Sequence, residues 1–282
     1  MQPTEAIIAH YAPRALVKGV LEALQAAGKD LDALTPDDLA PLDEFHSRGR
    51  KATQELAERA ALRTGERVLD IGCGIGGPAR FLAARFGCQV TGVDLTPEYC
   101  RLATLLAVRT GLADRVQFRV ADAVALPFED RSFDVGWMQH CSMNVPDKQR
   151  LFAEVGRVLR PGGRLVVYEV VAGSGGEVVM PVPWAHEAST SFLAPAAGLR
   201  RTIEDREFRV RDWEDATGEA LEWFQKIVER MRTAPPVLGI HLLLGPDMLT
   251  MSTNMMRNLE EGRIEIVKAI CERQDDAMEP PR

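Results

Sequence analysis

The chain has 282 residues, of which 46% are hydrophobic and 27% charged, so it has enough apolar material for a sizeable core. Its net charge of −7 argues against a protein that binds broadly to nucleic acid or anionic membranes. The five cysteines are odd in number and form no C-x-x-C pair, which suggests neither a disulfide framework nor a metal site. The N-terminus shows no secretory pattern and no window reaches 18 apolar residues, so we predict a reduced, cytoplasmic monomer or homodimer without nucleic-acid or membrane partners.

Residues 1–62 are predicted to form an N-terminal helical cap. Thr35 is the expected N-cap of a helix with Pro36 in its first turn. A further helix is expected from about Ser47 to Leu62, where RTGE stops it. Before these, apolar residues recur near helical spacing, namely Ile7, Ile8, Tyr11, Ala15, Leu16, Val20, Leu21 and Leu24.

Residues 63–217 show a different pattern, in which short apolar segments expected to be strands alternate with segments expected to be helices. The alternation indicates right-handed βαβ units and an α/β fold, with a mainly parallel sheet that carries helices on both faces. One helix is expected over DKQRLFAEVGRVLRPGG, and a later one over LAPAAGLRRTIEDREF. The expected strands are RVLDIG, CQVTGVDL, VQFRVADA, FDVGWMQH, GRLVVYEV and RVRDWEDAT.

Residues 218–262 are predicted to be a helical insert before the last strand. Two amphipathic helices fall there, EALEWFQKIVERM and PDMLTMSTNMMRNLEEG, and RIEIVKAICERQ within 263–282 is the expected last strand. We expect the insert to lie above one end of the sheet as a cover and, together with the N-terminal helices, to exclude water from the substrate as a lid.

A glycine-rich turn follows the first strand of the expected sheet. Gly72, Gly74 and Gly77 satisfy G-x-G-x-x-G, and Gly76 gives G-x-G-x-G as well. Glycines at such a turn let the backbone approach a ligand closely, next to the positively polarised helix N-terminus. The glycines alone fit either a dinucleotide pyrophosphate or an amino-acid nucleoside.

Acidic residues at three strand ends decide between these ligands. Asp70, two residues before the turn, would repel a pyrophosphate but suits a cationic amino group. Asp94 ends the next strand, where a carboxylate can accept hydrogen bonds from ribose hydroxyls, and Asp122 is placed to accept from an adenine amine. An amine, a ribose and an adenine together predict S-adenosyl-L-methionine (SAM), with S-adenosyl-L-homocysteine (SAH) as product. An NAD-dependent oxidoreductase and a catalytically silent SAM-binding protein are the rival classes.

Four motifs resemble those of class I SAM-dependent methyltransferases: VLDIGCGIGG, VTGVDLT, VADAVALPFEDRSFDVGW and VGRVLRPGGRLVVYEV. The resemblance spans roughly residues 50–172 and implies a Rossmann-like, seven-stranded sheet. More narrowly, DEFHSRGRKATQELAERAAL and MQHCSMNVPDK, with the helical insert, resemble sarcosine/dimethylglycine N-methyltransferases and tocopherol/sterol C-methyltransferases. This implies a compact apolar or amphipathic small-molecule acceptor.

The resemblance also implies roles for residues at matching positions. Gln139 would lie beside the methionine moiety or sulfonium, and His140 would face the substrate. The cofactor-binding residues would be Asp70, Gly72, Gly74 and Gly76 at the methionine part, Asp94 and Leu95 at the ribose, and Asp122 and Ala123 at the adenine.

His140, with Gln139 beside it, is the candidate catalytic residue because histidine titrates near neutral pH. A buried histidine bonded to a backbone carbonyl is the structural alternative. Glu169 is a candidate base for carbon methylation or a structural acid, and Arg200 or Arg201 could bind an acceptor carboxylate. The further candidates for substrate binding, each of which could instead be a packing residue, are Tyr11, His46, Trp184 and His186.

The acceptor atom stays open between nitrogen, oxygen and carbon, with an amine favoured. No D/N-P-P-Y/F/W motif follows the fourth strand, where the chain reads MQHCSMN, which argues against methylation of nucleobase amines or glutamine. The sequence therefore predicts a methyltransferase that moves a methyl group from SAM to a small molecule by in-line displacement.

Overall fold

The computed structural model describes residues 3–11, 16–233 and 236–274. Ala15, one of the apolar positions used above, lies outside these ranges, as do parts of the predicted 1–62 cap and of the 263–282 tail. None of the helices in the described ranges is both long and apolar enough to cross a membrane.

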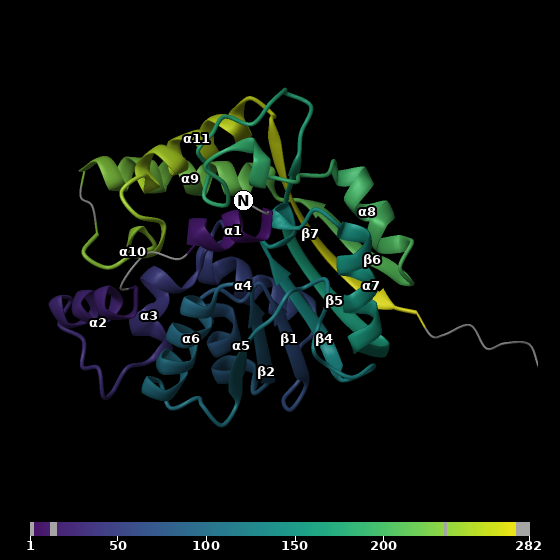
Figure 1. Cartoon of the computed structure of the whole chain (residues 1–282), viewed down its shortest axis with the longest axis horizontal. Helices are drawn as coiled ribbons and strands as arrows, with labels where there is room; N and C mark the ends of the chain where they lie inside the picture. Colours follow the sequence, from purple (N-terminus) through teal and green to yellow (C-terminus); the bar gives the residue numbers. More distant parts are fainter. Residues whose placement is uncertain (1–2, 12–15, 234–235, 275–282) are drawn as a thin grey trace, which may run out of the picture.

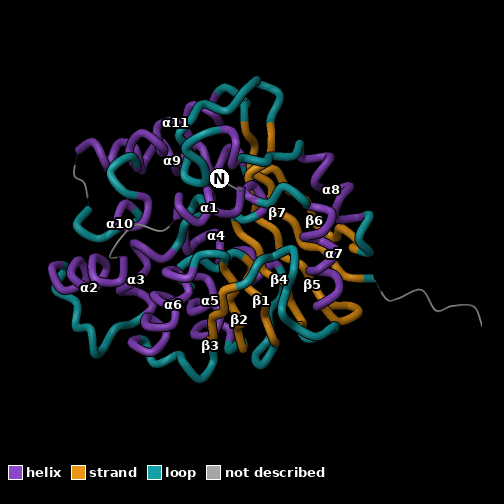
Figure 2. The backbone as a smooth tube through the Cα atoms, in the orientation of Figure 1, coloured by secondary structure: helices purple, strands orange, loops and turns teal. Residues whose placement is uncertain are grey.

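A seven-stranded sheet forms the centre of the molecule, in the order β3-β2-β1-β4-β5-β7-β6 (Figure 2). Strand β7 pairs antiparallel with both its neighbours, and the other pairings are parallel. The predicted mainly parallel α/β fold is confirmed. The strands are β1 (Arg67–Ile71), β2 (Gln89–Asp94), β3 (Val116–Val120), β4 (Phe133–Gln139), β5 (Leu159–Ala172), β6 (Phe208–Asp215) and β7 (Ile264–Arg273).

Helices cover both faces of the sheet (Figure 1). Two short 3-10 turns, Ser142–Asn144 and Ala188–Thr190, interrupt the loops. The α-helices are α1 (Pro3–Tyr11), α2 (Leu16–Ala26), α3 (Pro36–Asp43), α4 (Gly49–Arg59), α5 (Gly77–Phe86), α6 (Pro97–Arg109), α7 (Lys148–Val158), α8 (Ala196–Glu204), α9 (Thr217–Thr233), α10 (His241–Leu244) and α11 (Met248–Glu260).

Strand β5 shows how the pleat divides the core between the two faces. Val166 and Tyr168 belong to the core under α4, α5, α9 and α11, whereas Leu165 and Val167 belong to the core under α7 and α8. Successive side chains of a strand point to opposite faces, so a strand buried on both faces is a continuous apolar run. This explains why the apolar runs in the sequence predicted the strands well.

Of the two helix starts predicted before β1, that of α3 is confirmed and that of α4 is shifted. Thr35 accepts a hydrogen bond from the Asp38 amide, and the Asp38 side chain accepts one from the Thr35 amide, which completes a capping box. Helix α4 begins at Gly49 rather than at Ser47, because Arg48 takes a left-handed backbone conformation (φ 63°). The turn before α4 therefore stays free to contribute side chains to the interior.

The predicted helix over DKQRLFAEVGRVLRPGG is shorter than expected. It ends at Val158, and the residues Leu159–Ala172 form β5. Pro161 cannot continue a helix, and Gly162 adopts φ +70°. The Pro-Gly-Gly segment thus belongs to the start of a strand.

The two helices of the insert, α9 and α11, pack on one face of the sheet. Phe224 of α9 and Met255 and Leu259 of α11 are buried in the same core as Ile266 of β7. A short helix, α10, which the sequence did not predict, lies between them. In Figure 1 the pair lies beyond α1, away from the glycine-rich turn.

Candidate active site

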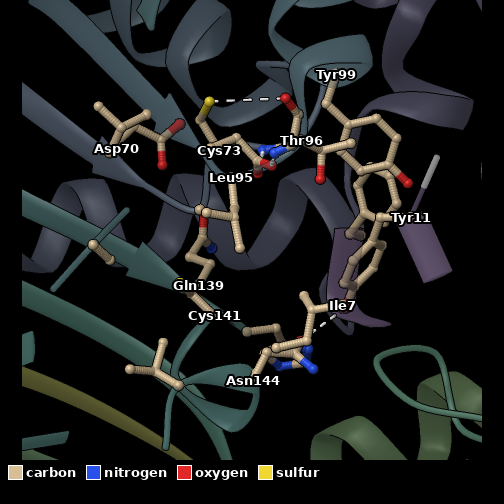
Figure 3. Close-up of a pocket in the computed structure, with 18 of the residues that line it drawn as sticks. Ile7, Tyr11, Asp70, Cys73, Leu95, Thr96, Tyr99, Gln139, Cys141 and Asn144 are labelled. Carbon is tan, nitrogen blue, oxygen red and sulfur yellow. Dashed lines mark hydrogen bonds between the residues drawn. The ribbon is translucent and has the colours of Figure 1, made fainter. Parts of the chain in front are cut away.

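A cavity opens at the carboxyl ends of β1, β2 and β4, where ligands of parallel α/β sheets bind. Asp70 of β1, Asp94 of β2 and Asp122 after β3 all line it, so the structure brings the three predicted acids together. Figure 3 shows Asp70 on one side of the hollow and the rings of Tyr11 and Tyr99 on the other.

The glycine-rich turn forms one wall of the cavity. The amides of Gly72 and Cys73 both donate to the Val93 carbonyl oxygen, at 2.9 and 3.0 Å. Gly72 has φ +72°, and a Cβ added there would lie 2.6 Å from Cys141 Sγ. Gly72 must therefore be glycine so that the turn can pass closely beneath the exit of β4.

Gly76, also predicted to bind the cofactor, does not line the cavity. Its φ is +81°, and an added Cβ would lie 2.3 Å from Phe118 Cζ. The need for glycine at this position comes from packing against β3. The predicted cofactor contacts at Gly74, Leu95 and Ala123 do fall on the cavity wall.

Asp94 is held in place by the turn that it faces. Its Oδ2 accepts from the Gly74 amide at 2.9 Å and its Oδ1 from the Thr96 amide at 2.8 Å. Burial raises the pKa of Asp94, and these hydrogen bonds act in the opposite direction. Each carboxylate oxygen has a second lone pair, so the group can still accept from two hydroxyls of a ligand.

Asp70 is 2% exposed, and its Oδ2 finds no hydrogen-bond partner among the described residues. Burial, followed by the charges of Glu44 and Asp94, raises the pKa of Asp70 to about 8. Leaving a buried acceptor unpaired costs about 1–3 kcal/mol. A cationic amino group in the cavity would remove this cost and favour the ionised carboxylate.

Gln139 presents an amide NH₂ group at the cavity wall. Trp137 Nε1 donates to Gln139 Oε1 at 2.7 Å, and Thr53 Oγ1 donates to the same atom at 3.3 Å. The side-chain amide is therefore fixed, and its buried Nε2 has no partner in the described part of the chain. This nitrogen is a donor, so it suits an oxygen of a ligand and not a positive charge.

His140 lies at the end of β4 with a left-handed backbone (φ 49°) and lines the cavity. Its ring tilts against the Tyr168 ring, with centroids 5.0 Å apart, and its Nε2 lies 3.5 Å from Ser47 Oγ. Ser47 Oγ in turn shares a 2.6 Å hydrogen bond with Tyr168 OH. Burial, and secondarily the nearby His46, lowers the pKa of His140 well below its usual value. His140 is therefore neutral near pH 7, and its burial disfavours the protonated ring.

Tyr11 and His46 also line the cavity, but their side chains are tied to the protein. Tyr11 OH donates to Asn144 Oδ1 at 3.0 Å and so fastens α1 over the cavity. His46 has Nδ1 3.1 Å from the Ser47 carbonyl oxygen and Nε2 2.7 Å from Glu44 Oε2. Both ring nitrogens of His46 are engaged, which leaves an edge contact as its way of touching a ligand.

Trp184 and His186 do not lie on the cavity wall. Trp184 is 2% exposed, its Nε1 donates to Ser191 Oγ at 2.9 Å, and its carbonyl oxygen accepts from Asn144 Nδ2. His186 contacts the ring of His10, with centroids 4.6 Å apart. The loop that contains both residues therefore supports Asn144 and α1 from behind.

Glu169 also lies behind the wall, where it holds the turn that follows His140. Its carboxylate accepts from the amides of Cys141 and Ser142, both at 3.0 Å, and from Ser142 Oγ at 2.9 Å. Burial raises the pKa of Glu169 to about 7 against these bonds. Arg200 pairs with Glu204 on the surface of α8, and neither it nor Arg201 reaches the cavity.

Sequence reasoning missed several residues of the wall, and most of them come from elements far from the glycine turn. Asp43 and Phe45 are part of DEFHSRG, and Asn144 is part of MQHCSMN. These two motifs therefore contained wall residues that were not singled out. The expected lid residues at 218–262 contribute none of the described wall residues, whereas α1 contributes Ile7 and Tyr11.

Comparison with known proteins agrees with this geometry. Residues 69–167 match a family model described as a methyltransferase domain. The chain is 39% identical over 134 residues to methyltransferase GfsG of Streptomyces halstedii, a match covering 48% of each protein. It is 42% identical over 102 residues to the chloroplastic tocopherol O-methyltransferase of Arabidopsis thaliana, covering 36% of this chain and 29% of that protein. The matches thus span about half the length of the first relative and less than a third of the second.

Among solved structures, the [4+2]-cyclase SpnF superposes with a TM-score of 0.69 at 26% identity, covering 93% of each chain. A geranyl diphosphate methyltransferase was solved with SAM and superposes with a TM-score of 0.64 at 24% identity, covering 79% of this chain and 84% of that one. The predicted resemblance and cofactor class are confirmed. Residues 69–167 are therefore a methyltransferase domain, and the chain around them has the fold of the class I SAM-dependent methyltransferases.

Proposed function

We propose that this protein transfers a methyl group from SAM to a small-molecule acceptor. The observation that carries the proposal is the meeting of three strand-end carboxylates with the glycine turn in one cavity, where a buried oxygen of Asp70 has no partner among the described residues. The donor set fits SAM, because its ligand-facing atoms are acceptors for an ammonium and for hydroxyls, with one amide donor from Gln139.

Each end of SAM has a matching part of the wall. Asp70 would accept from the amino group and Asp94 from the ribose hydroxyls. Asp122 and Ala123 would flank the adenine, and Gln139 Nε2 would donate to an oxygen of the methionine part. These assignments rest on position along the strand ends and on the chemistry of each side chain.

SAM supplies a methyl group on a positively charged sulfur. The protein has to hold the acceptor in line with that methyl and keep water away, and such positioning contributes up to about 7–11 kcal/mol to lowering the barrier. Helix α1 covers the cavity through Ile7 and Tyr11, fastened by the hydrogen bond from Tyr11 to Asn144. His140, which lines the cavity, is our candidate for orienting or deprotonating the acceptor.

The test is to measure SAM and SAH binding by calorimetry and SAH formation by mass spectrometry with a broad set of small molecules. Both binding and acceptor-dependent SAH are expected. A structural neighbour with this fold is a [4+2]-cyclase, so binding without any SAH formation would favour a protein that uses the cavity without methyl transfer. Absence of heat with either compound would overturn the proposal. A cytoplasmic location and a monomeric or homodimeric state stay predictions.

A further inference from the structure

We propose that His10 is a positioning residue that holds helix α1 closed over the cavity only while its imidazole is neutral, so that α1 works as a proton-sensitive lid. This inference rests on the proposed function in one respect, since it takes the cavity beneath α1 as the SAM site. It is carried by the contacts that fasten α1, by the surroundings of the His10 ring and by a second histidine that faces it, His186.

Helix α1 lies over the cavity and is fastened to a single loop. Its residues Ile7 and Tyr11 line the cavity, and Figure 3 shows both on the same side of the hollow. Tyr11 OH donates to Asn144 Oδ1, and Asn144 Nδ2 in turn donates to two carbonyl oxygens of the loop at residues 180–191. One hydrogen-bonded route from α1 to this loop therefore passes through Asn144.

The second route to the loop is direct and depends on His10. Its Nε2 lies 2.9 Å from the Pro183 carbonyl oxygen. A carbonyl oxygen can only accept, so Nε2 carries the proton and the neutral ring leaves Nδ1 without one. Nδ1 is buried and has no hydrogen-bond partner among the described residues. The docked position of α1 therefore fits a neutral imidazole in one tautomer.

Protonation of His10 would add an N–H and a positive charge at this buried nitrogen. A buried donor without an acceptor is costly, and a charged one more so. Burial accordingly lowers the pKa of His10, while the hydrogen bond to Pro183 acts in the opposite direction and is the weaker effect. A proton on His10 therefore favours release of α1 from the loop.

The group that faces His10 from the loop is another imidazole and not an acid. The rings of His10 and His186 meet edge to face, with centroids 4.6 Å apart, and the charge of His186 further lowers the pKa of His10. Two protonated rings at this distance repel each other. Tyr11, whose ring also contacts His10, is neutral because burial raises its pKa. The acids on α1 and the loop, Glu5 and Glu187, are exposed to solvent.

The direction of the pH effect follows from the two states of the lid. In the released state the His10 ring is solvated and has the ordinary histidine pKa of 6.5, whereas in the docked state its pKa is lower. Docking is therefore fully favoured above this ordinary value. As pH falls below it, the closing equilibrium weakens by up to about tenfold per pH unit until the docked-state pKa is reached. Helix α1 would thus exclude water from the site near neutral pH and open the site in acid.

Hydrogen exchange of the ligand-free protein tests the lid independently of SAM. We would compare the protection of the amides in residues 3–11 at pH 7.5 and pH 5.5, corrected for intrinsic exchange, with β4 as an internal reference. Protection of α1 should fall by about fivefold or more at the lower pH, and that of β4 should not. His10→Gln, whose amide can donate to the Pro183 carbonyl but does not titrate, should change by less than about twofold. Constant protection of α1 in the unmodified protein, or an equal fall in the Gln variant, would overturn the inference.

His186→Phe is the second variant, because it keeps an aromatic ring at the contact and removes the facing charge. Helix α1 should lose less protection between the two pH values in this variant than in the unmodified protein. His241→Phe changes a histidine of α10 outside this contact and is the matched control, which should behave like the unmodified protein. A loss in His186→Phe as large as in the control would contradict the role given to the pair.

The effect on the cofactor site is measured separately, by stopped-flow dissociation of SAH. Between pH 7.5 and pH 5.5 the dissociation rate should rise by about fivefold or more in the unmodified protein relative to His10→Gln. Asp70 is present in both proteins, so its own titration cancels in this ratio. A ratio near one would show that α1 does not gate the cavity and would overturn the inference. Failure of both proteins to bind SAH would instead count against the proposed function, and the hydrogen-exchange result would still decide on the lid.

Discussion

Two clusters of buried charge in this protein differ in whether their charges are paired. On the α9 side of the sheet, Lys268 of β7 lies 2.5 Å from Glu219 and 3.5 Å from Glu214, and Arg48 lies 2.8 Å from Glu219. The Lys268 side chain is 3% exposed, yet it has several partners. This cluster binds α4, α9, β6 and β7 together.

Asp70, on the cavity wall, is buried to a similar degree, but its Oδ2 has no hydrogen-bond partner among the described residues. The charged neighbours that act on Asp70 in the described part of the chain, Glu44 and Asp94, are themselves acidic. Buried charges are normally paired, because an unpaired one is costly. The comparison teaches that burial alone does not mark a site. A buried polar atom that lacks a partner at a cavity wall indicates a binding site. A buried network in which every charge is paired indicates a structural role.

Removing the centre of the paired cluster should have the largest effect on stability. Lys268→Ala is expected to lower the free energy of unfolding by about 2–4 kcal/mol, less than for fully buried pairs because Glu219 and Glu214 can regain solvent. Denaturant unfolding measures this change, and SAM affinity should not move. Arg200→Ala, which breaks the exposed Arg200–Glu204 pair, is the matched control and should cost under about 0.5 kcal/mol. Equal effects would mean that the Lys268 cluster is not structural.

Substituting a cavity acid should instead change SAM affinity. Asp94→Ala is expected to weaken SAM binding by ~1–3 kcal/mol, because its charge-assisted hydrogen bonds to the ribose and its hold on the Gly74 amide are both lost. Calorimetry gives the affinity. Asp212→Ala, which removes an acid that pairs with Arg59 outside the cavity, should leave SAM affinity unchanged. Unaltered affinity in the Asp94 variant would contradict the ribose assignment.

The contribution of Asp70 to stability and to SAM affinity is expected to depend on pH. The folded pKa of Asp70, about 8, lies above that of an unfolded aspartate, so the ligand-free protein holds a proton that the unfolded chain has lost. Its contribution to stability is therefore full below the unfolded pKa and declines as pH rises through that of the folded state, about 8.

Binding of the SAM ammonium should release that proton, so SAM affinity should rise with pH by up to about tenfold per unit below pH 8. Titrations in buffers of different ionisation enthalpy would detect the released proton. Asp70→Asn should flatten the pH dependence. A flat profile in the unmodified protein would show that Asp70 is already ionised.

The smallest effect on turnover is expected from removing one of the hydroxyl groups that position His140. Tyr168→Phe removes the hydroxyl that lies 2.6 Å from Ser47 Oγ and should slow turnover by about 0.5–1.5 kcal/mol, roughly two- to tenfold. SAM affinity should stay constant, which separates positioning of His140 from general damage. Ser47→Ala should give a similar loss, and the two changes together should not add. Full additivity, or a change confined to melting temperature, would remove the positioning role.

Much of the site could be predicted because its signals are local. The order of strands and helices, the glycine turn and the acids at strand ends all follow from short patterns, and parallel strands bring their carboxyl ends to one edge. Trp184 and His186 were harder to assign. Nothing near them in sequence tells that their loop packs behind Asn144, more than 35 residues earlier.

The sequence by itself determined the α/β class, the SAM-type turn and which carboxylates would share a cavity, since each depends on residues close together in the chain. The tertiary structure decided that, of the two expected parts of the lid, α1 contributes described wall residues and the insert does not. It further decided that Ser47 and Tyr168 meet beside His140, and that the Glu169 carboxylate accepts hydrogen bonds from a turn. It also decided which buried charges have partners. Those facts depend on contacts between segments about 30 to 170 residues apart, and no local pattern of charge or hydropathy encodes them.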